Sequence, residues 1–223
     1  LFMTEGWPCL NTLKLGYYRF TYLSMILRSN TPVFSMKLKI ITRCAVLSVL
    51  AATILSTPAA TLHEGDSAPK LSVSKWIQGE PVKAFQPGTV YLVEFWASWW
   101  LPCQEAMAPV NRLHHKYKDK GLVVIGQNVK EPPGTKVESF IKRMGSLVSY
   151  RIALDEGATN RWSGRMQENW LQSAEAGIPT AFLIDKKGNI SFIGHPGAID
   201  DELIEQVLSG TFDPKKRALA REA

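Results

Sequence analysis

The stretch Tyr91–Cys103, which reads YLVEFWASWWLPC, decides the fold of this chain. A continuous run of apolar residues with β-branched and aromatic side chains is typical of a strand that is covered on both faces. Pro102 is favoured at the opening of a helix, because the N–H group that proline lacks would have no partner there. We therefore predict a buried strand over Tyr91–Trp96, a short turn, and a helix that begins near Leu101.

Phe95–Cys103 reads FWASWWLPC and resembles the active-site signature of the thioredoxin superfamily, F-W-A-x-W-C-x-P-C. This form is similar to the TlpA-type, redoxin-like branch, whose members are exported from the bacterial cytoplasm. Every element of the signature is present except the first cysteine, whose place Trp100 takes. The resemblance implies an α/β chain with a thioredoxin-like fold, in which helices flank a central mixed β-sheet, with an N-terminal hairpin and a TlpA-type helical insertion.

Trp100 changes the chemistry that the resemblance implies. In the family, the first cysteine attacks as a thiolate at a helix N-terminus, and the second cysteine then resolves the mixed disulfide. An indole cannot form a disulfide, so Trp100 removes the attacking step. Cys103 stands at the position of the resolving cysteine, which the family buries. Two interpretations stay open: Cys103 is a packed, inert residue, or it retains single-thiol chemistry.

Glu94 lies within the predicted strand, where thioredoxin-like proteins keep a buried carboxylate. By resemblance, it passes a proton to or from the resolving cysteine. The alternative is a polar residue that faces a watery pocket or one face of the sheet, because a carboxylate in a strand core is costly unless it is paired. The residues alone leave both roles open.

The segment Gly177–Thr180, which reads GIPT, is the second feature shared with the family. The resemblance implies a cis peptide bond before its proline and a backbone that pairs with an extended substrate beside the active-site turn. The implied substrate groove is lined by Trp96, Trp99, Pro102, Ile178 and Pro179. The expected partners are proteins or peptides in an extended conformation, including thiol-bearing ones, and neither a cofactor nor a metal ion is expected.

The charge of the chain gives no reason to expect a nucleic-acid partner. The 223 residues carry a formal net charge of +6, but residues 1–59 hold six Lys or Arg and one acidic residue. Residues 60–223 hold twenty Lys or Arg and nineteen Asp or Glu, which leaves that part near +1. This balance lacks the excess of basic residues that nucleic-acid binding requires.

Residues 36–60 have the pattern of a secretory signal peptide. Residues 36–43 are basic, residues 44–56 form an apolar run of about a dozen residues, and residues 57–60 are small enough for cleavage. The apolar run is shorter than the ~20 residues that a transmembrane helix needs. We expect export to the periplasm or cell envelope, with only transient membrane contact through this peptide; an uncleaved signal anchor is the alternative.

The remaining residues divide into three parts. Residues 1–35 begin with Leu1 and are interpreted as an over-extended N-terminal leader, or alternatively as a real leader with a membrane-facing role. Residues 61–213 make up the thioredoxin-like domain, and residues 214–223 are a charged tail. Cleavage near residue 60 would leave Cys103 as the single thiol.

Periodicity and turn residues predict the other elements. Strands at 71–77 and 80–85 would form the N-terminal hairpin. Further strands are expected over 122–126, 150–155, 180–185 and 190–194, and helices over 103–118, 136–144, 158–173 and 200–208. Helix 136–144 is the insertion, and helix 158–173 should carry Trp162, Met166 and Trp170 as core and groove lining.

Three functions remain open at this point. The first is an exported, redox-degenerate thioredoxin-like protein that binds extended partners. The second is a surviving disulfide oxidoreductase that uses Cys103 as a single thiol, in envelope redox homeostasis or cytochrome maturation. The third is a decayed gene product with no activity. An insulin-reduction assay separates the first two.

Overall fold

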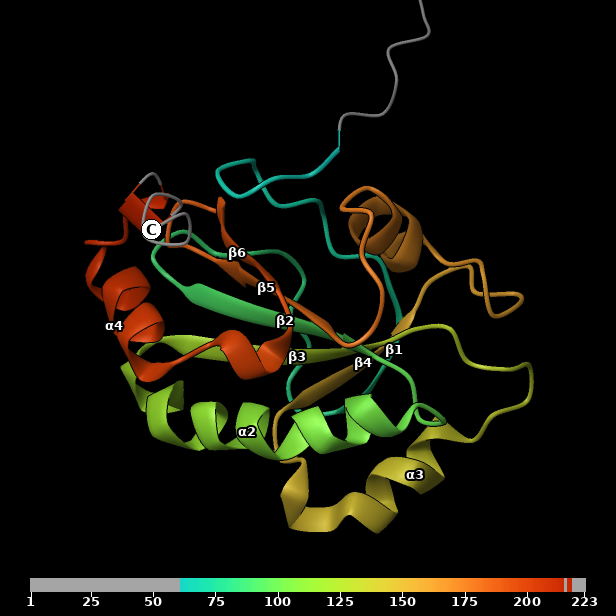
Figure 1. Cartoon of the computed structure of the whole chain (residues 1–223). Helices are drawn as coiled ribbons and strands as arrows, with labels where there is room; N and C mark the ends of the chain where they lie inside the picture. Colours follow the sequence, from blue (N-terminus) through green and yellow to red (C-terminus); the bar gives the residue numbers. More distant parts are fainter. Residues whose placement is uncertain (1–60, 215, 218–223) are drawn as a thin grey trace, which may run out of the picture. The chain divides into compact units, whose positions relative to one another are not determined.

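A computed structural model of the protein describes residues 61–214 and 216–217 (Figure 1). The expected leader, residues 1–35, the expected signal peptide, residues 36–60, and the tail from residue 218 lie outside the described residues. Among the residues that are described, no helix combines the length and the apolar character needed to cross a membrane.

A six-stranded mixed sheet forms the centre of the fold, in the order β1-β4-β3-β2-β5-β6. The strands are β1 (Val73–Gln78), β2 (Val90–Trp96), β3 (Leu122–Asn128), β4 (Arg151–Asp155), β5 (Thr180–Ile184) and β6 (Ile190–Gly194). The pairs β2–β3 and β3–β4 are parallel, and the other neighbours are antiparallel. The predicted strand Tyr91–Trp96 is therefore confirmed as β2, and it lies in the interior of the sheet with every residue buried.

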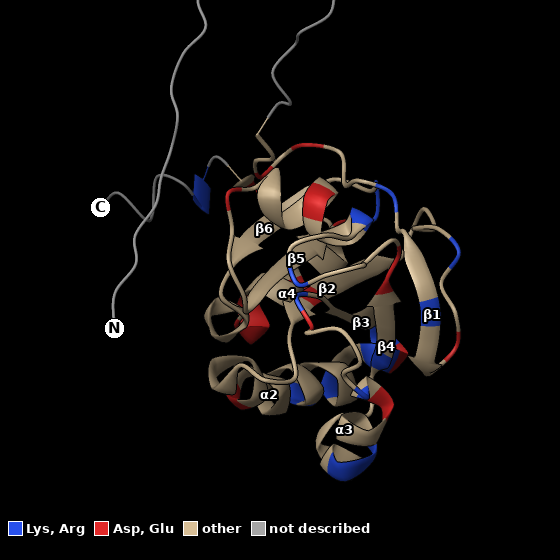
Figure 2. Cartoon of the chain, turned by 90° about the vertical axis from the view of Figure 1, so that its right-hand side faces the viewer, with Lys and Arg blue, Asp and Glu red and all other residues tan. Residues whose placement is uncertain are grey.

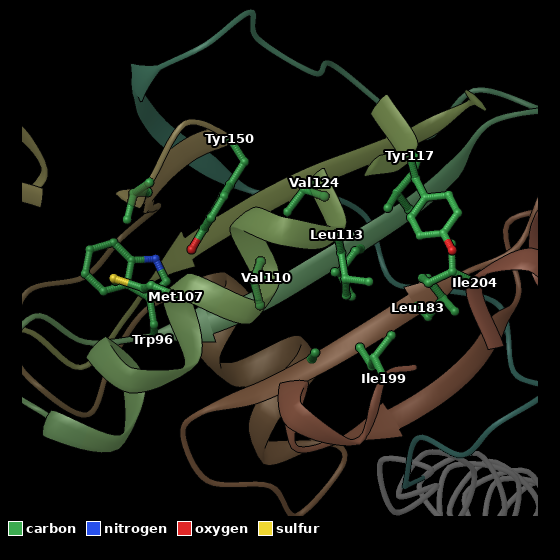
Figure 3. Packing of buried hydrophobic residues seen from close by; sticks show 14 of the residues in the cluster. Trp96, Met107, Val110, Leu113, Tyr117, Val124, Tyr150, Leu183, Ile199 and Ile204 are labelled. Carbon is green, nitrogen blue, oxygen red and sulfur yellow. The ribbon is translucent and has the colours of Figure 1, made fainter. Parts of the chain in front are cut away.

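Helices cover both faces of this sheet (Figure 1). The helices are α2 (Leu101–Tyr117), η1 (Lys118–Lys120), α3 (Val137–Met144), η2 (Gly145–Leu147), the π-helix η3 (Gln167–Gln172), η4 (Pro196–Ala198) and α4 (Asp201–Ser209). The helices α2, α3 and α4 pack on one face, against a core that Figure 3 shows in close-up. The π-helix η3 packs on the opposite face, where it buries Trp170.

Strand β2 contributes side chains to the cores on both faces of the sheet, because successive side chains of a strand point to opposite faces. Leu92 and Trp96 lie in the core under α2, whereas Tyr91, Val93 and Phe95 lie in the core under η3. Glu94 shares the parity of Leu92 and Trp96, so its carboxylate is directed into the core under α2. The central strand thus places the carboxylate of Glu94 on the same side of the sheet as the helix that contains Cys103.

The predicted N-terminal hairpin is wrong. Residues 73–78 form β1, but β1 pairs with β4, and residues 80–85 form no strand. Pro81 has no N–H group to donate to a ladder, and the carbonyl of Glu80 accepts a 2.9 Å hydrogen bond from Arg151 Nε instead. Phe85 packs against Tyr91, with ring centroids 4.8 Å apart, and so becomes part of the core rather than of a strand.

The predicted helix over residues 158–173 is shorter than expected. Residues 158–164 form a loop, and the helical conformation begins at Arg165. The buried carboxylate of Asp155 accepts hydrogen bonds from the backbone N–H groups of Met166 and Gln167, at 2.8 and 3.0 Å, and this contact fixes the start of the helix. Trp162 consequently lies in the loop and is 68% exposed, so it is not a core residue, whereas Met166 and Trp170 are buried.

Candidate functional site at the turn between β2 and α2

Residues 97–100 form the turn that carries the chain from β2 into α2. The N–H of Trp100 donates a 3.3 Å hydrogen bond to the carbonyl of Ala97, and the carbonyl of Trp100 accepts from the N–H of Cys103 at 3.0 Å. Trp100 is the residue that precedes α2, and its side chain is 41% exposed. The indole therefore stands at the solvent-facing helix entrance, where unpaired N–H groups and the helix dipole favour negative charge.

Cys103 lies one helical turn further on and is fully buried. Burial raises the pKa of its thiol to about 12, and the nearby carboxylates of Glu94 and Glu131 also raise it. A hydrogen bond with the backbone of Ala97 acts in the opposite direction and is the weaker influence. The side chain is therefore a neutral thiol at ordinary pH, and the thiolate is the form that thiol chemistry requires.

Glu94 lies on the same side of the sheet as Cys103 and is fully buried. Its Oε2 atom accepts a 2.9 Å hydrogen bond from the hydroxyl of Tyr150. Burial raises the pKa of Glu94 to about 7, and the hydrogen bond from Tyr150 lowers it by less. Oε1 has no hydrogen-bond partner among the described residues. Glu94 therefore lies in the interior on the face of the sheet that α2 covers, and its role in proton transfer stays a prediction.

Trp96 is the one predicted groove residue that is fully buried. Its side chain is fully buried, and its ring lies 5.6 Å from that of Phe140 on α3. Figure 3 shows its indole in the core on the same side as Tyr150. The reason is strand parity: Trp96 follows Glu94 by two residues and points to the face that α2 and α3 cover. Trp96 is therefore a core residue, and its assignment to the groove is wrong.

The segment that contains Ile178 and Pro179 lies beside the turn. Phe95 of β2 pairs with Thr180 of β5, so the two residues before Thr180 continue past the end of β2. The Ile178–Pro179 peptide bond is cis, which is the isomer that the resemblance implies. Both side chains are half-buried, as is Pro102 at the start of α2. No backbone hydrogen bond to the N–H or C=O of Ile178 occurs within residues 61–214 and 216–217.

Glu131 lies in the loop that follows β3 and binds the turn, a role that no sequence pattern indicates. Its carboxylate accepts hydrogen bonds from the backbone N–H of Ser98, from the Ser98 hydroxyl at 2.9 Å and from Asn128 Nδ2 at 2.8 Å. The loop contributes a second contact, because Trp99 Nε1 donates a 2.9 Å hydrogen bond to the carbonyl of Lys130. An acidic residue in a polar loop has no periodicity to distinguish it, so the contact depends on the fold.

Three exposed indoles lie near this end of the sheet: Trp99 and Trp100 on the turn, and Trp162 on the loop that follows β4. We call them the indole platform. The rings of Trp99 and Trp100 lie 5.6 Å apart, and Trp99 is 43% exposed. The guanidinium of Arg161 lies 4.6 Å from the Trp99 ring centroid, and the ammonium of Lys130 lies 5.7 Å from that of Trp162. The platform is therefore a mixed aromatic and cationic surface.

The loops after β3 and β4 project from the end of the sheet at which β2 enters α2 (Figure 1). A cavity of about 370 Å³ lies between residues 128–135 and residues 154–160 of these loops. Figure 2 faces this side of the molecule and shows Lys and Arg among Asp and Glu. Within the part of the chain that the structure describes, no group of three or more His, Cys, Asp or Glu residues could hold a metal ion.

Comparison with known proteins identifies relatives over most of the domain. The sequence model of the Redoxin family matches residues 63–208. Protein FixW of Rhizobium leguminosarum is 29% identical over 171 residues, which cover 74% of this chain and 72% of that protein. The thiol-disulfide oxidoreductase ResA of Geobacillus kaustophilus is 29% identical over 178 residues, which cover 76% of this chain and 94% of that protein.

Solved structures agree on the fold. A thiol-disulfide isomerase from Corynebacterium glutamicum superposes with a TM-score of 0.52 at 24% identity, covering 66% of this chain and 97% of that one. A thioredoxin-like superfamily protein superposes with a TM-score of 0.54 at 17% identity, covering 65% of this chain and 95% of that one. The fold is therefore thioredoxin-like, as the sequence predicts. With the family match extending from β1 to α4, this chain belongs to the redoxin family and is related to its thiol-disulfide oxidoreductases.

Proposed function

We propose that this protein is an exported, thioredoxin-like binding protein that holds extended polypeptide segments without catalysing thiol–disulfide exchange. The observation that carries the proposal is the combination of an exposed Trp100 with a buried Cys103. The exposed helix entrance, where a nucleophilic thiolate would be stabilised, carries an indole, and the only cysteine within the described residues is fully buried.

The raised pKa of Cys103 supports the loss of exchange chemistry. A thiol with a pKa of about 12 is almost entirely protonated near neutral pH. Exchange needs a thiolate that can reach a disulfide, and Cys103 offers neither the charge nor the access. Glu94 would exchange a proton with this thiol in an active relative, but here no first cysteine exists to form the disulfide that Cys103 would resolve.

The surroundings of the turn support a binding role. The backbone of Ile178 is free to form hydrogen bonds with a strand-like partner segment. The indole platform offers exposed aromatic surface near it, since the turn that carries Trp99 and Trp100 follows the strand paired with β5. Exposed aromatic side chains next to free backbone groups are a common way to bind a peptide.

A single-thiol oxidoreductase is the alternative function, and the similarity to the thiol-disulfide oxidoreductase ResA favours it. Insulin reduction separates the two, using the full chain with Cys9→Ser and Cys44→Ser so that Cys103 is the only thiol. We expect no reduction above the rate of the same protein with Cys103→Ser. Reduction that depends on Cys103 would overturn the binding proposal in favour of the alternative.

Export is the second part of the proposal and has its own test. The pattern of residues 36–60 supports cleavage near residue 60. Intact-mass measurement of the protein purified from its host should give an N-terminus close to residue 61. A mass that retains residues 36–60 would mean that the segment anchors the protein instead.

A further inference from the structure

Four residues near the turn form a closed ring of contacts. The Trp99 indole donates to the carbonyl of Lys130, and the ammonium of Lys130 lies over the ring of Trp162. Arg161 precedes Trp162 in the chain and lies over the ring of Trp99. The ring therefore joins the turn at residues 97–100 to the loops after β3 and β4. It also places two cations on two exposed indoles.

Neither cation of this ring is neutralised by the protein itself. The ion pairs among residues 61–214 and 216–217 include Lys75–Glu138, Arg112–Asp201, Lys116–Asp201 and Arg165–Glu156. Arg161 and Lys130 take part in none of them. Glu131 is next to Lys130 in the chain, but its carboxylate is directed to the donors of Ser98 and Asn128.

The stacked arrangement leaves the cations available to a ligand. A guanidinium that lies over an aromatic ring keeps the N–H donors at its edge, and these match the two oxygens of a carboxylate. The backbone of Lys130 has φ of 57°, a conformation that a side-chain-bearing residue rarely adopts. The contacts of the ring and of Glu131 hold the loop in this conformation, so the ammonium is positioned before a partner arrives.

We propose that the extended segment bound by this protein carries an acidic residue, Asp or Glu, whose carboxylate binds Arg161 and Lys130 while neighbouring side chains of the segment pack on Trp99 and Trp100. This inference rests on the proposed binding function and adds the chemistry of the partner to it. Charge complementarity carries the assignment, because two unpaired cations flank the surface and the acidic residue of the same loop is already engaged.

The segments of this chain outside the described residues are poor occupants for the same surface. Residues 1–60 hold six Lys or Arg and one acidic residue, and residues 218–223 hold one Arg and one Glu. The basic leader would be repelled by Arg161 and Lys130, and in residues 218–223 an Arg stands directly beside the one Glu and opposes its binding to these cations. The partner is therefore a separate acidic polypeptide rather than the protein's own leader or tail.

A peptide-selection experiment measures this preference directly. The probe is a pool of acetylated nonapeptides that contain no cysteine. The five central positions are degenerate, and two flanking positions hold Asp or Asn in equal amounts. Full-length protein is immobilised, and the retained peptides are counted by mass spectrometry. We expect Asp to be enriched over Asn by about three- to tenfold, which corresponds to two exposed charge pairs. Salt at about 1 M should bring the ratio close to one.

A matched pair of double variants identifies the cations responsible. Arg161→Gln with Lys130→Asn removes the two charges, and Asn tolerates the backbone conformation of residue 130. The control is Arg143→Gln with Lys142→Gln, which removes two charges from α3, where Arg143 likewise lies over an aromatic ring, that of Phe140. Both proteins have the same net charge, so the basic leader contributes equally to each. Only the first variant should lose the preference for Asp.

The outcomes separate this inference from the proposed function. Retention of Asp and Asn peptides in equal amounts, or the same loss in both double variants, would overturn the acidic partner while leaving peptide binding intact. No retention above a blank support would overturn both proposals. A concentration-dependent dimer that is abolished by Arg161→Gln with Lys130→Asn would assign the surface to a second copy of the chain and so overturn the acidic partner.

Discussion

The hydroxyl of Tyr150 donates a 2.9 Å hydrogen bond to Glu94 Oε2 in the core beneath α2. Tyr150 lies just before β4 and Glu94 lies on β2, two strands away in the sheet. This single bond partly offsets the burial of the carboxylate, whose pKa nevertheless rises to about 7. Burial and the nearby Glu94 carboxylate both keep the pKa of Tyr150 well above its usual range, so the phenol remains the donor.

Glu94→Gln should stabilise the protein at high pH. In the wild type the pKa of Glu94 is about 7 when folded and near 4.5 when unfolded, so the folded state binds the proton more tightly. The wild-type protein therefore loses stability as the pH rises from the unfolded value through the folded one, by about 2 to 4 kcal/mol in total. The amide variant has no such loss.

Urea unfolding at about pH 4 and about pH 8 measures this difference. The variant and the wild type should have similar stability at the lower pH, and the variant should be more stable at the higher one. Glu138→Gln is the control, because Glu138 is largely exposed and its pKa is lowered by the hydrogen bond to Lys75. A Glu94→Gln protein that gains nothing at high pH would mean that the carboxylate is solvated.

Gly126→Ala should destabilise the protein by about 1 to 3 kcal/mol, because overpacking a dense core costs that much. Gly126 pairs with Glu94 across β2 and β3. A Cβ atom there would lie 2.7 Å from Ile152 Cδ1, 2.9 Å from Tyr150 Cε2 and 3.1 Å from Trp96 Nε1. The matched control is Gly177→Ala, since a Cβ atom at residue 177 would meet nothing within 4 Å. Equal unfolding midpoints for the two variants would contradict this packing.

Trp100→Cys should create a disulfide with Cys103 in the background that lacks Cys9 and Cys44. The two positions lie three residues apart at the first turn of α2, which is the spacing of bridged cysteines in this fold. The new thiol should be acidified by the helix N-terminus to a pKa of roughly 3.5 to 7.5. Titration of free thiols after mild oxidation should find two in the reduced protein and none in the oxidised one.

Trp100→Ser is the control for the restored cysteine, because it also removes the indole but cannot form a bridge. Its single thiol should persist after the same oxidation. If the Trp100→Cys protein folds normally and keeps both thiols, then the helix entrance has moved away from the geometry of the family. That result would point to a groove built around the indole rather than to a redox site with one residue replaced.

Glu131→Gln should loosen the turn at residues 97–100. The amide of glutamine can replace only part of the acceptor capacity that the carboxylate offers to Ser98 and Asn128. Loss of charge-assisted hydrogen bonds of this kind costs about 1 to 3 kcal/mol. Hydrogen exchange at the Ser98 amide should become faster, and the fluorescence of Trp99 should change. Unchanged exchange at Ser98 would show that the turn is held by α2 alone.

The central strand, the start of α2 and the position of the replaced cysteine all follow from the amino-acid sequence alone. These features depend on local chemistry: the apolar run that forms β2, the proline near the helix start and the identity of residue 100. Predictions from local sequence patterns are wrong at residues 80–85, where a strand is expected, and at residues 158–164, where a helix is expected. The contacts that decide these segments are made by Arg151 and by the carboxylate of Asp155, which lie in another element of the fold.

Which residues make up the site depends instead on contacts between elements of the fold. Strand parity, together with the cover provided by α3, places Trp96 in the core and leaves Trp99 and Trp100 at the surface. The parallel registers of β3 with β2 and β4 bring the loops of Glu131 and Arg161 to the same end of the sheet. The contacts of Tyr150, Glu131 and Arg161 join residues far apart in the chain, and sequence periodicity describes only neighbours within one element.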